Sequence, residues 1–104
     1  MVRQIHLAEI LFTNHTDYKV RPILIIKENS FGDILFMPMT TNLIINGIMI
    51  NVDDLEIGYL PKPSKVVFEK IGVIHKSLIT KHIATITGNK NNEIIQSFIN
   101  FITK

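Results

Sequence analysis

Apolar and polar residues alternate in short runs along most of the chain, and this pattern predicts a protein built mainly from β-strands. The first three strand candidates are residues 5–12, 21–27 and 33–40, which turn-forming residues separate. Because a short turn joins the second candidate to the third, we expect these two to pair antiparallel. Arg21 would then begin one strand and Thr40 would end the next, which brings both residues to the same end of the sheet.

Beyond residue 40 the pattern predicts a loop at 41–46, a strand at 48–52, an irregular surface segment at 55–63, a long strand at 64–74, one helical turn at 76–79 and a strand at 82–86. Gly58, Pro61 and Pro63 argue against regular structure in the irregular segment. Glu69 stands out because it is an acid within an apolar run. It either has a function or faces outward from a half-exposed strand.

The chain ends in a predicted amphipathic helix. Apolar residues recur there with the spacing of a helical face, at Ile94, Ile95, Phe98, Ile99, Phe101 and Ile102. Asparagines before this run and Glu93 in its first turn suit a helix N-terminus. We therefore expect a mainly β fold with α, an α+β protein, in which the helix covers a barrel or sheet.

Composition limits the classes of protein to consider. A chain of 104 residues is the size of one domain, so residues 1–104 are expected to form a single unit. With 46% hydrophobic and 19% charged residues, the chain is of the globular type. It has no cysteine, no apolar signal core and no apolar run long enough for a membrane span, so we expect a cytoplasmic protein without membrane association. The net charge of +2 permits an anionic partner.

Histidines and short motifs give no indication of a metal or cofactor site. The four histidines lack the short spacing of metal ligands, and the sequence has no glycine-rich phosphate loop. His6, inside a predicted strand, is interpreted as a packing residue. His15 differs because it lies in the polar loop before Arg21 and because imidazole titrates near neutral pH.

Arg21 is the most informative charged residue. The proline that follows it favours extended backbone geometry, and the chain has only one other arginine, Arg3. A guanidinium offers a planar fork of donors that matches a phosphate group, whereas lysine is a flexible point charge. The alternative is a surface arginine that happens to begin a strand.

Two segments resemble the signature of the MazF/PemK (Kid-like) toxins of bacterial type II toxin–antitoxin modules. Residues 20–25, VRPILI, are similar to the family's x-R-P-x-L-V/I, and residues 32–41, GDILFMPMTT, to its strand ending in P-[IV]-T-[ST]. Residues 64–74 and the closing helix also fit, so the resemblance spans nearly the whole chain. It implies an SH3-like small β-barrel of the PemK/CcdB type, with short helices. The chain departs from the pattern at Arg3-Gln4, where Gly-Asp is usual, and in the loop before Arg21, which lacks the family's Glu-Gln-x-Gly. It also has Gly72 in place of a frequent arginine, and Val67 where some members carry a functional arginine.

The resemblance also implies a function. Members of the family are homodimeric endoribonucleases that cut single-stranded RNA without a metal, and a small cognate antitoxin silences them. Arg21 and Thr40 match the family's catalytic arginine and threonine, while Glu69 and His15 fall where some members have a general base and a loop histidine near the phosphate. Neighbouring polar residues are expected to contact the RNA, namely Lys19, Thr41, Asn42 and Ser64.

The residues suit cleavage through a 2′,3′-cyclic phosphate. Arg21 would neutralise the pentavalent phosphorane, Thr40 would hydrogen-bond the phosphate, Glu69 would accept the 2′ proton and His15 would protonate the leaving oxygen. Two other functions remain open. CcdB-like toxins share the barrel but bind gyrase, and a relative that binds RNA without cutting it would keep the groove alone.

Overall fold

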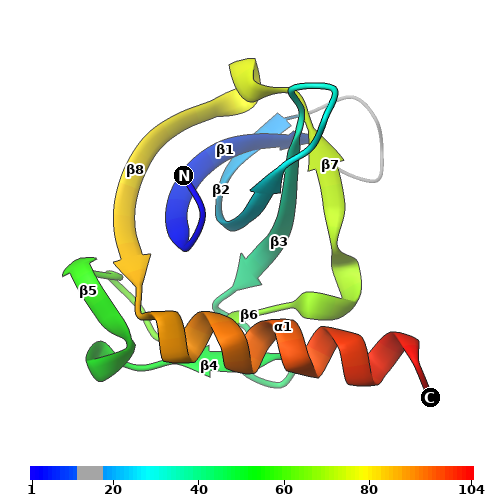
Figure 1. Ribbon diagram of the computed structural model, residues 1–104. Coiled ribbons are helices and arrows are strands. Elements are labelled where there is room, and N and C mark those ends of the chain that lie inside the picture. The colour runs from blue at the N-terminus through cyan, green and yellow to red at the C-terminus, as the bar shows by residue number, and fades with distance from the viewer. Residues whose placement is uncertain (12–17) are drawn as a thin grey trace.

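Three long antiparallel strands form the centre of a strongly curved sheet in the computed structural model, which describes residues 1–11 and 18–104 (Figure 1). They are β1 (Gln4–Leu11), β2 (Tyr18–Glu28) and β3 (Ile34–Thr40). Ile5 lies opposite Leu24, and Leu24 lies opposite Met37, so β2 is paired on both sides. The predicted pairing of the second and third strands is confirmed.

Five further strands extend the sheet on both sides, so that it nearly closes into a barrel. They are β4 (Ile48–Ile50), β5 (Leu55–Gly58), β6 (Ser64–Val66), β7 (Gly72–Ile74) and β8 (Ile79–Ile86). The strand order is β4-β6-β3-β2-β1-β8-β5, and β7 pairs with β3. Single turns of 3-10 helix form at η1 (Val52–Asp54), η2 (Phe68–Lys70) and η3 (Lys76–Leu78). The predicted class, a small β-barrel with short helices and a C-terminal helix, is confirmed.

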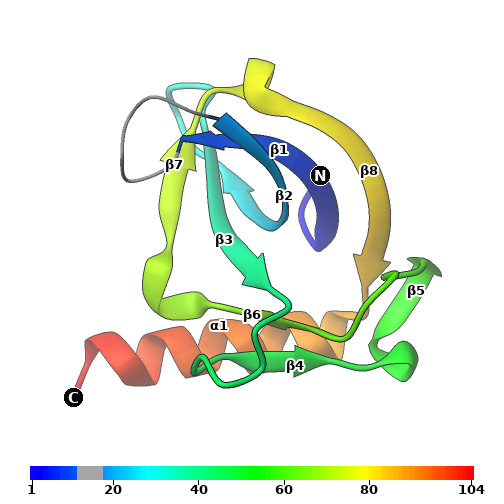
Figure 2. The same cartoon turned by 180° about the vertical axis from the view of Figure 1, so that it is seen from behind.

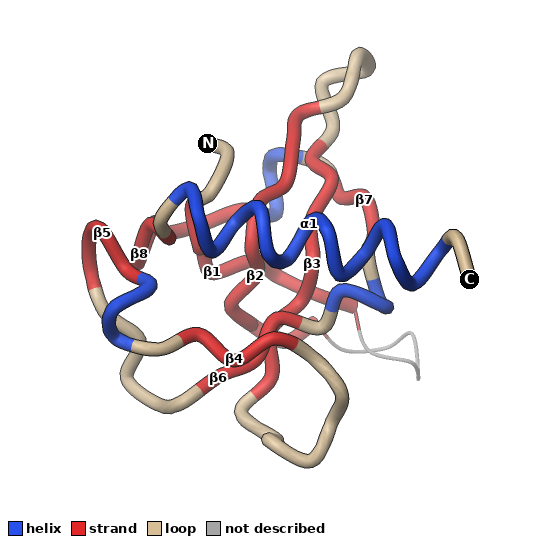
Figure 3. The backbone as a smooth tube through the Cα atoms, turned by 60° about the horizontal axis from the view of Figure 1, so that its bottom comes forward, coloured by secondary structure: helices blue, strands red, loops and turns tan. Residues whose placement is uncertain are grey.

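The central strands are buried on both faces. On one face Leu24 and Met37 pack with Ile94 of α1 (Gly88–Ile102), and on the other Ile23 and Ile25 form a second apolar cluster. Figure 3 shows α1 crossing in front of β1, β2 and β3. Burial on both faces explains why β2 has a continuous apolar run rather than an alternating one.

The C-terminal helix is confirmed, but it begins earlier than the apolar spacing predicts. Thr87 is the N-cap, and its Oγ1 accepts a hydrogen bond of 3.2 Å from the backbone N–H of Lys90. The asparagines therefore lie inside the helix rather than before it, and Glu93 lies beyond the first turn. Ile94 is fully buried, and Phe98 packs against the same cluster. Among the described residues, no helix has both the length and the apolarity of a membrane span.

The expected long strand over residues 64–74 is wrong, because β6 and β7 pair with different parts of β3. Val66 lies opposite Met39, and Gly72 lies opposite Phe36. Only three positions of β3 separate Phe36 from Met39, whereas six separate Val66 from Gly72. The extra residues form η2, which places Glu69 in an exposed turn rather than in a strand.

The segment at 55–63 is more regular than its glycine and prolines suggest. Leu55 lies opposite Ile86 and Gly58 opposite Ala84, so β5 adds to the sheet beside β8. Gly58 has φ +76°, and a Cβ at this position would collide with the carbonyl oxygen of Ile83. Glycine is therefore what allows β5 to approach β8, and only residues 59–63 remain irregular.

Arg3 combines an unusual backbone conformation with hydrogen bonds to two other strands. Its φ is 66°, in the left-handed region that favours glycine, which agrees with the glycine usual at this position in the resembling family. Its Nη1 donates 3.1 Å hydrogen bonds to the carboxylate of Glu56 and to the backbone carbonyl of Ile86. Arg3 therefore joins the start of β1 to β5 and β8.

His6 packs against another histidine. Its ring stacks on that of His82 with centroids 5.1 Å apart, and its Nε2 lies 2.8 Å from Oε1 of Gln4. Its Nδ1 is buried and has no hydrogen-bond partner within the described part of the chain. Burial, followed by the nearby His82 and the N-terminal ammonium, lowers the pKa of His6 below its ordinary value of 6.5.

Candidate functional site

A groove of about 570 Å³ lies where β2, β3 and η2 meet. Its walls combine apolar side chains with cations and hydroxyls, and its lining residues are Ile10, Arg21, Pro22, Phe36, Pro38, Met39, Thr40, Thr41, Ile45, Val67 and Lys70. A concave surface that is mostly apolar, with a few polar groups converging on it, is typical of a ligand site. Arg21 and Thr40, the two leading sequence candidates, both line it.

The sequence pattern predicts Arg21 at the start of a strand, but the structure places it within β2. β2 begins at Tyr18 because β1 supplies pairing partners for the residues that precede Arg21, which itself lies opposite Ala8. On the other side of β2, the pairing with β3 ends at Ile23 and Pro38, which lie two residues from Arg21 and Thr40 along their strands. The Arg21 side chain is exposed. It therefore faces solvent from a position that is fixed by the sheet.

Thr40 is the last residue of β3 and begins the turn that leads to β4. Its Oγ1 accepts a 3.0 Å hydrogen bond from the backbone N–H of Asn42. A hydroxyl that accepts one hydrogen bond can still donate its own hydrogen. Thr40 is thus oriented by the turn and keeps a donor for an anionic ligand in the groove.

Lys70 and Ile45 line the groove, but the sequence pattern does not predict them. Lys70 belongs to η2, where its backbone N–H donates a 3.1 Å hydrogen bond to the carbonyl of Val67. Its ammonium forms no ion pair with any described carboxylate. In a continuous strand Lys70 would lie on the face opposite Glu69. Lys70 therefore becomes a candidate for the groove only when the break at η2 is known.

Glu69, the predicted general base, is not among the groove-lining residues. It is exposed, and its Oε2 accepts a 2.8 Å hydrogen bond from Nδ2 of Asn46. His15, the predicted acid, lies outside the described residues. The structure therefore brings together two of the four predicted catalytic residues, Arg21 and Thr40.

The four predicted RNA contacts differ in whether they line the groove or lie near it. Thr41 lines it, and Asn42 follows in the same turn. Lys19 is exposed on β2 two residues before Arg21, and residues two apart in a strand share a face. Ser64 is only 4% exposed, and its Oγ donates a 3.0 Å hydrogen bond to the carbonyl of Lys62, so its position does not favour contact with a ligand.

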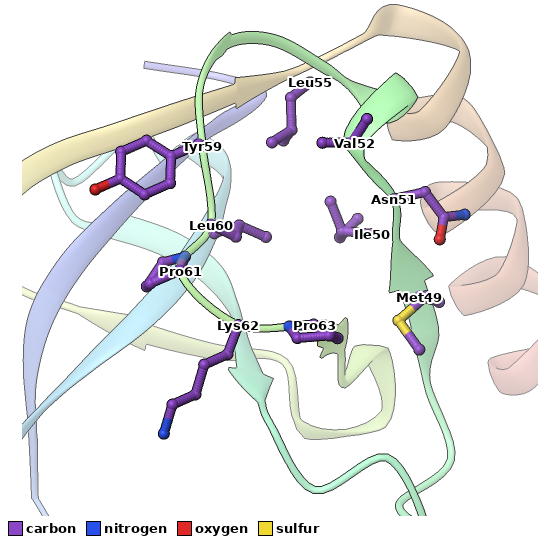
Figure 4. Close-up of a pocket in the computed structure, with 10 residues that line it drawn as sticks. All are labelled: Met49, Ile50, Asn51, Val52, Leu55, Tyr59, Leu60, Pro61, Lys62 and Pro63. Carbon is purple, nitrogen blue, oxygen red and sulfur yellow. The ribbon is translucent and has the colours of Figure 1, made fainter.

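A second cavity of about 330 Å³ lies between β4 and the irregular segment after β5. Its lining residues are Met49, Ile50, Asn51, Val52, Leu55, Tyr59, Leu60, Pro61, Lys62 and Pro63. Figure 4 shows Ile50, Leu55 and Leu60 pointing inward, whereas Tyr59 and Lys62 point away from the interior. Its polar groups do not converge, so it suits phosphate chemistry less well than the groove does. No three or more His, Asp or Glu side chains in residues 1–11 and 18–104 are grouped to hold a metal ion.

Comparisons with known proteins give a matching family model and a solved structure of similar fold. The family model described as PemK-like, MazF-like toxin of type II toxin–antitoxin system matches residues 3–102. Among solved structures, the Mycobacterium tuberculosis toxin MazF-mt6 is similar, with a TM-score of 0.70 and 21% sequence identity, over 94% of this chain and 94% of that chain. No curated protein sequence shows significant similarity.

Proposed function

The chain belongs to the PemK-like, MazF-like toxins of type II toxin–antitoxin systems, and we propose that it is an endoribonuclease that cuts single-stranded RNA. Cleavage of mRNA in the cytoplasm would inhibit translation and growth. The observation that carries this proposal is the groove that Arg21, Thr40 and Lys70 line together. It offers two cations and a hydroxyl donor beside apolar walls, which suits a phosphate group flanked by nucleobases.

The proposed reaction is an attack of the ribose 2′-oxygen on its own 3′-phosphate. The bond between phosphorus and the 2′-oxygen forms, the bond to the 5′-oxygen of the next nucleotide breaks, and the products carry a 2′,3′-cyclic phosphate and a 5′-hydroxyl. Arg21 binds the two non-bridging phosphoryl oxygens and stabilises the phosphorane, and Thr40 donates a hydrogen bond to one of them. Because the reaction requires the 2′-hydroxyl, DNA is not a substrate.

Proton transfer completes the reaction. A base must accept the 2′ proton, and an acid must protonate the leaving 5′-oxygen. His15 remains the predicted acid. Glu69 accepts a hydrogen bond from Asn46 and lies outside the groove lining. The proposal therefore does not depend on Glu69 as the base, and it assigns phosphate binding to Arg21 and Thr40.

We also propose that the chain acts as a homodimer and that a small antitoxin silences it. Membership of a type II family implies an antitoxin partner. The end of α1 exposes Ile99, Phe101 and Ile102 at 39%, 45% and 59%, and an apolar patch of this kind favours association. Light scattering at micromolar concentration is expected to show a dimer. A stable monomer would contradict the first part of the proposal.

Two assays run in parallel test the function. Purified protein is incubated with a long single-stranded RNA, and in parallel with gyrase and relaxed plasmid. Cut RNA with unaffected supercoiling supports the endoribonuclease. Inhibited supercoiling with intact RNA would support a CcdB-like toxin, and RNA binding without cleavage would support a non-cutting relative.

A further inference from the structure

The loop at residues 41–46 is held in shape by side chains from outside it. Figure 2 shows the chain leaving β3, passing β6 and returning as β4. Nζ of Lys65, in β6, donates hydrogen bonds of 2.8 Å and 3.2 Å to the carbonyl oxygens of Leu43 and Ile45. One ammonium thus binds two carbonyls of the same loop, which fixes the backbone between them.

A second anchor joins the end of the loop to η2. This anchor is the hydrogen bond of 2.8 Å from Nδ2 of Asn46 to Oε2 of Glu69. The loop also has internal hydrogen bonds, since the backbone N–H groups of Ile44 and Ile45 donate to Asn42 at 3.2 Å each. Glu69 therefore has a partner that explains its place in the turn without proton transfer.

The loop presents one aliphatic side chain at the groove and another in solvent next to it. Ile45 lines the groove beside Thr41, and Ile44 is 94% exposed. Ile44 is almost fully exposed on a loop that hydrogen bonds hold in place, so it has no packing role in the described structure. Apolar side chains next to cations that bind phosphate are suited to contact the face of an unstacked nucleobase.

We propose that residues 41–46 form a pre-shaped wall of the RNA groove, in which Ile44 and Ile45 contact the nucleobase beside the scissile phosphate. Glu69 and Lys65 are then positioning residues that hold this wall, and Glu69 acts through Asn46 rather than as a base. This inference rests on the proposed function and assigns a substrate contact to the same site.

Exchange of the two hydrogen-bonding partners tests the role of Glu69. Glu69→Gln keeps an acceptor for Asn46 but cannot act as a base, so cleavage should stay within about twofold of the parent with an unchanged pH profile. Asn46→Ala removes the hydrogen bond, and Asn46→Asp sets two carboxylates against each other. Each of these should raise KM about tenfold, the effect of one lost hydrogen bond, and change kcat less. The double variant Asn46→Asp/Glu69→Gln restores a donor and an acceptor, and should recover the parent KM.

Two results would overturn this role. Glu69→Gln that abolishes cleavage and removes the acidic limb of the pH profile would make Glu69 the base. An Asn46→Asp/Glu69→Gln protein no better than Asn46→Asp alone would show that the hydrogen bond between these residues does not act in the site.

The contact with the nucleobase is tested by sequencing the RNA ends. Ile44→Ser should relax the choice of cleavage site, whereas Ile57→Ser, which alters an isoleucine of β5 that is 59% exposed, should leave it unchanged. An identical set of sites for Ile44→Ser and the parent would contradict the contact.

Binding and hydrogen exchange separate a failure of this inference from a failure of the proposed function. If the parent cuts no RNA, the proposed function is wrong, and the loop is judged by its affinity for a 2′-O-methyl RNA that cannot be cut. Asn46→Ala should weaken this binding about tenfold and speed amide exchange at Ile44 and Ile45. The double variant Asn46→Asp/Glu69→Gln should match the parent in both measurements. Equal binding by all these proteins would overturn the inference.

Discussion

Arg21 of β2 and Thr40 of β3 line the same groove from neighbouring antiparallel strands. The pairing of these strands ends at Ile23 and Pro38, each two residues from Arg21 or Thr40. A guanidinium and a hydroxyl thus line one groove from strands of the sheet, and the hydrogen bond from Asn42 orients the hydroxyl. This arrangement can bind several oxygens of one phosphate group.

The first prediction concerns the geometry of Arg21. If its guanidinium binds two phosphoryl oxygens in the transition state, Arg21→Lys keeps the charge but loses the fork, so it should fall nearly as far as Arg21→Ala. The expected loss is roughly 10²–10³-fold in kcat/KM, or about 3–4 kcal/mol. Because the side chain is exposed, the free energy of unfolding should change by less than about 0.5 kcal/mol in both variants. Parent activity in Arg21→Lys would show that charge alone is sufficient.

The second prediction concerns the hydroxyl of Thr40. Thr40→Val keeps the shape and removes both the donor to the phosphate and the acceptor for the N–H of Asn42. We expect kcat to fall about tenfold, less than for Arg21→Lys, because the phosphate loses one hydrogen bond from an uncharged donor and keeps the Arg21 guanidinium. Thr40→Ser retains the hydroxyl and is the matched control, which should stay close to the parent. A loss in Thr40→Ser as large as in Thr40→Val would point to the methyl group instead.

The third prediction is that acid weakens the fold through His6. Burial and the nearby His82 lower the pKa of His6 in the folded state. The His6 ring therefore takes up a proton more readily in the unfolded chain than in the folded chain. As the pH falls from about 7.5 to about 5, the unfolded state gains protons first and the free energy of unfolding decreases. His6→Gln should flatten this dependence in thermal or urea unfolding. An identical slope in the parent and in His6→Gln would remove His6 as the cause.

The fourth prediction is that glycine at position 3 gives a more stable protein than alanine does. Alanine usually stabilises a chain relative to glycine, but Arg3 has φ 66°, a conformation that costs an L side chain about 1 kcal/mol or more. Arg3→Ala and Arg3→Gly both lose the hydrogen bonds to Glu56 and Ile86. Arg3→Gly should therefore unfold at a higher temperature than Arg3→Ala, with a difference of about 1 kcal/mol. Equal stability would mean that the backbone relaxes at this position.

Local patterns in the sequence predict the elements whose signals are local. The alternation of residue types predicts β1 and β3 closely, and the 3.6-residue spacing predicts α1. Arg21 and Thr40 could be assigned to one end of the sheet because the short turn between β2 and β3 allows few registers. The resemblance to known toxins rests on the same two strands.

Features that depend on long-range pairing could not be predicted in this way. β5 exists because β8 offers it an edge, and its local sequence with Gly58 indicates a loop. The break at η2 arises because β6 and β7 pair at different positions of β3, an offset that no period in residues 64–74 reveals. Lys70 and the pairing of Glu69 with Asn46 follow from this break, which is why the site was predicted only in part.

The most direct test is to digest a long single-stranded RNA in excess EDTA and to identify the ends of the fragments, using the parent and Arg21→Ala. We predict that the parent cuts in EDTA and leaves 2′,3′-cyclic phosphate and 5′-hydroxyl ends, and that Arg21→Ala, although folded, does not cut above background. RNA that stays intact in EDTA and is cut once Mg²⁺ or Zn²⁺ is restored, or equal cleavage by Arg21→Ala, would contradict the proposed mechanism.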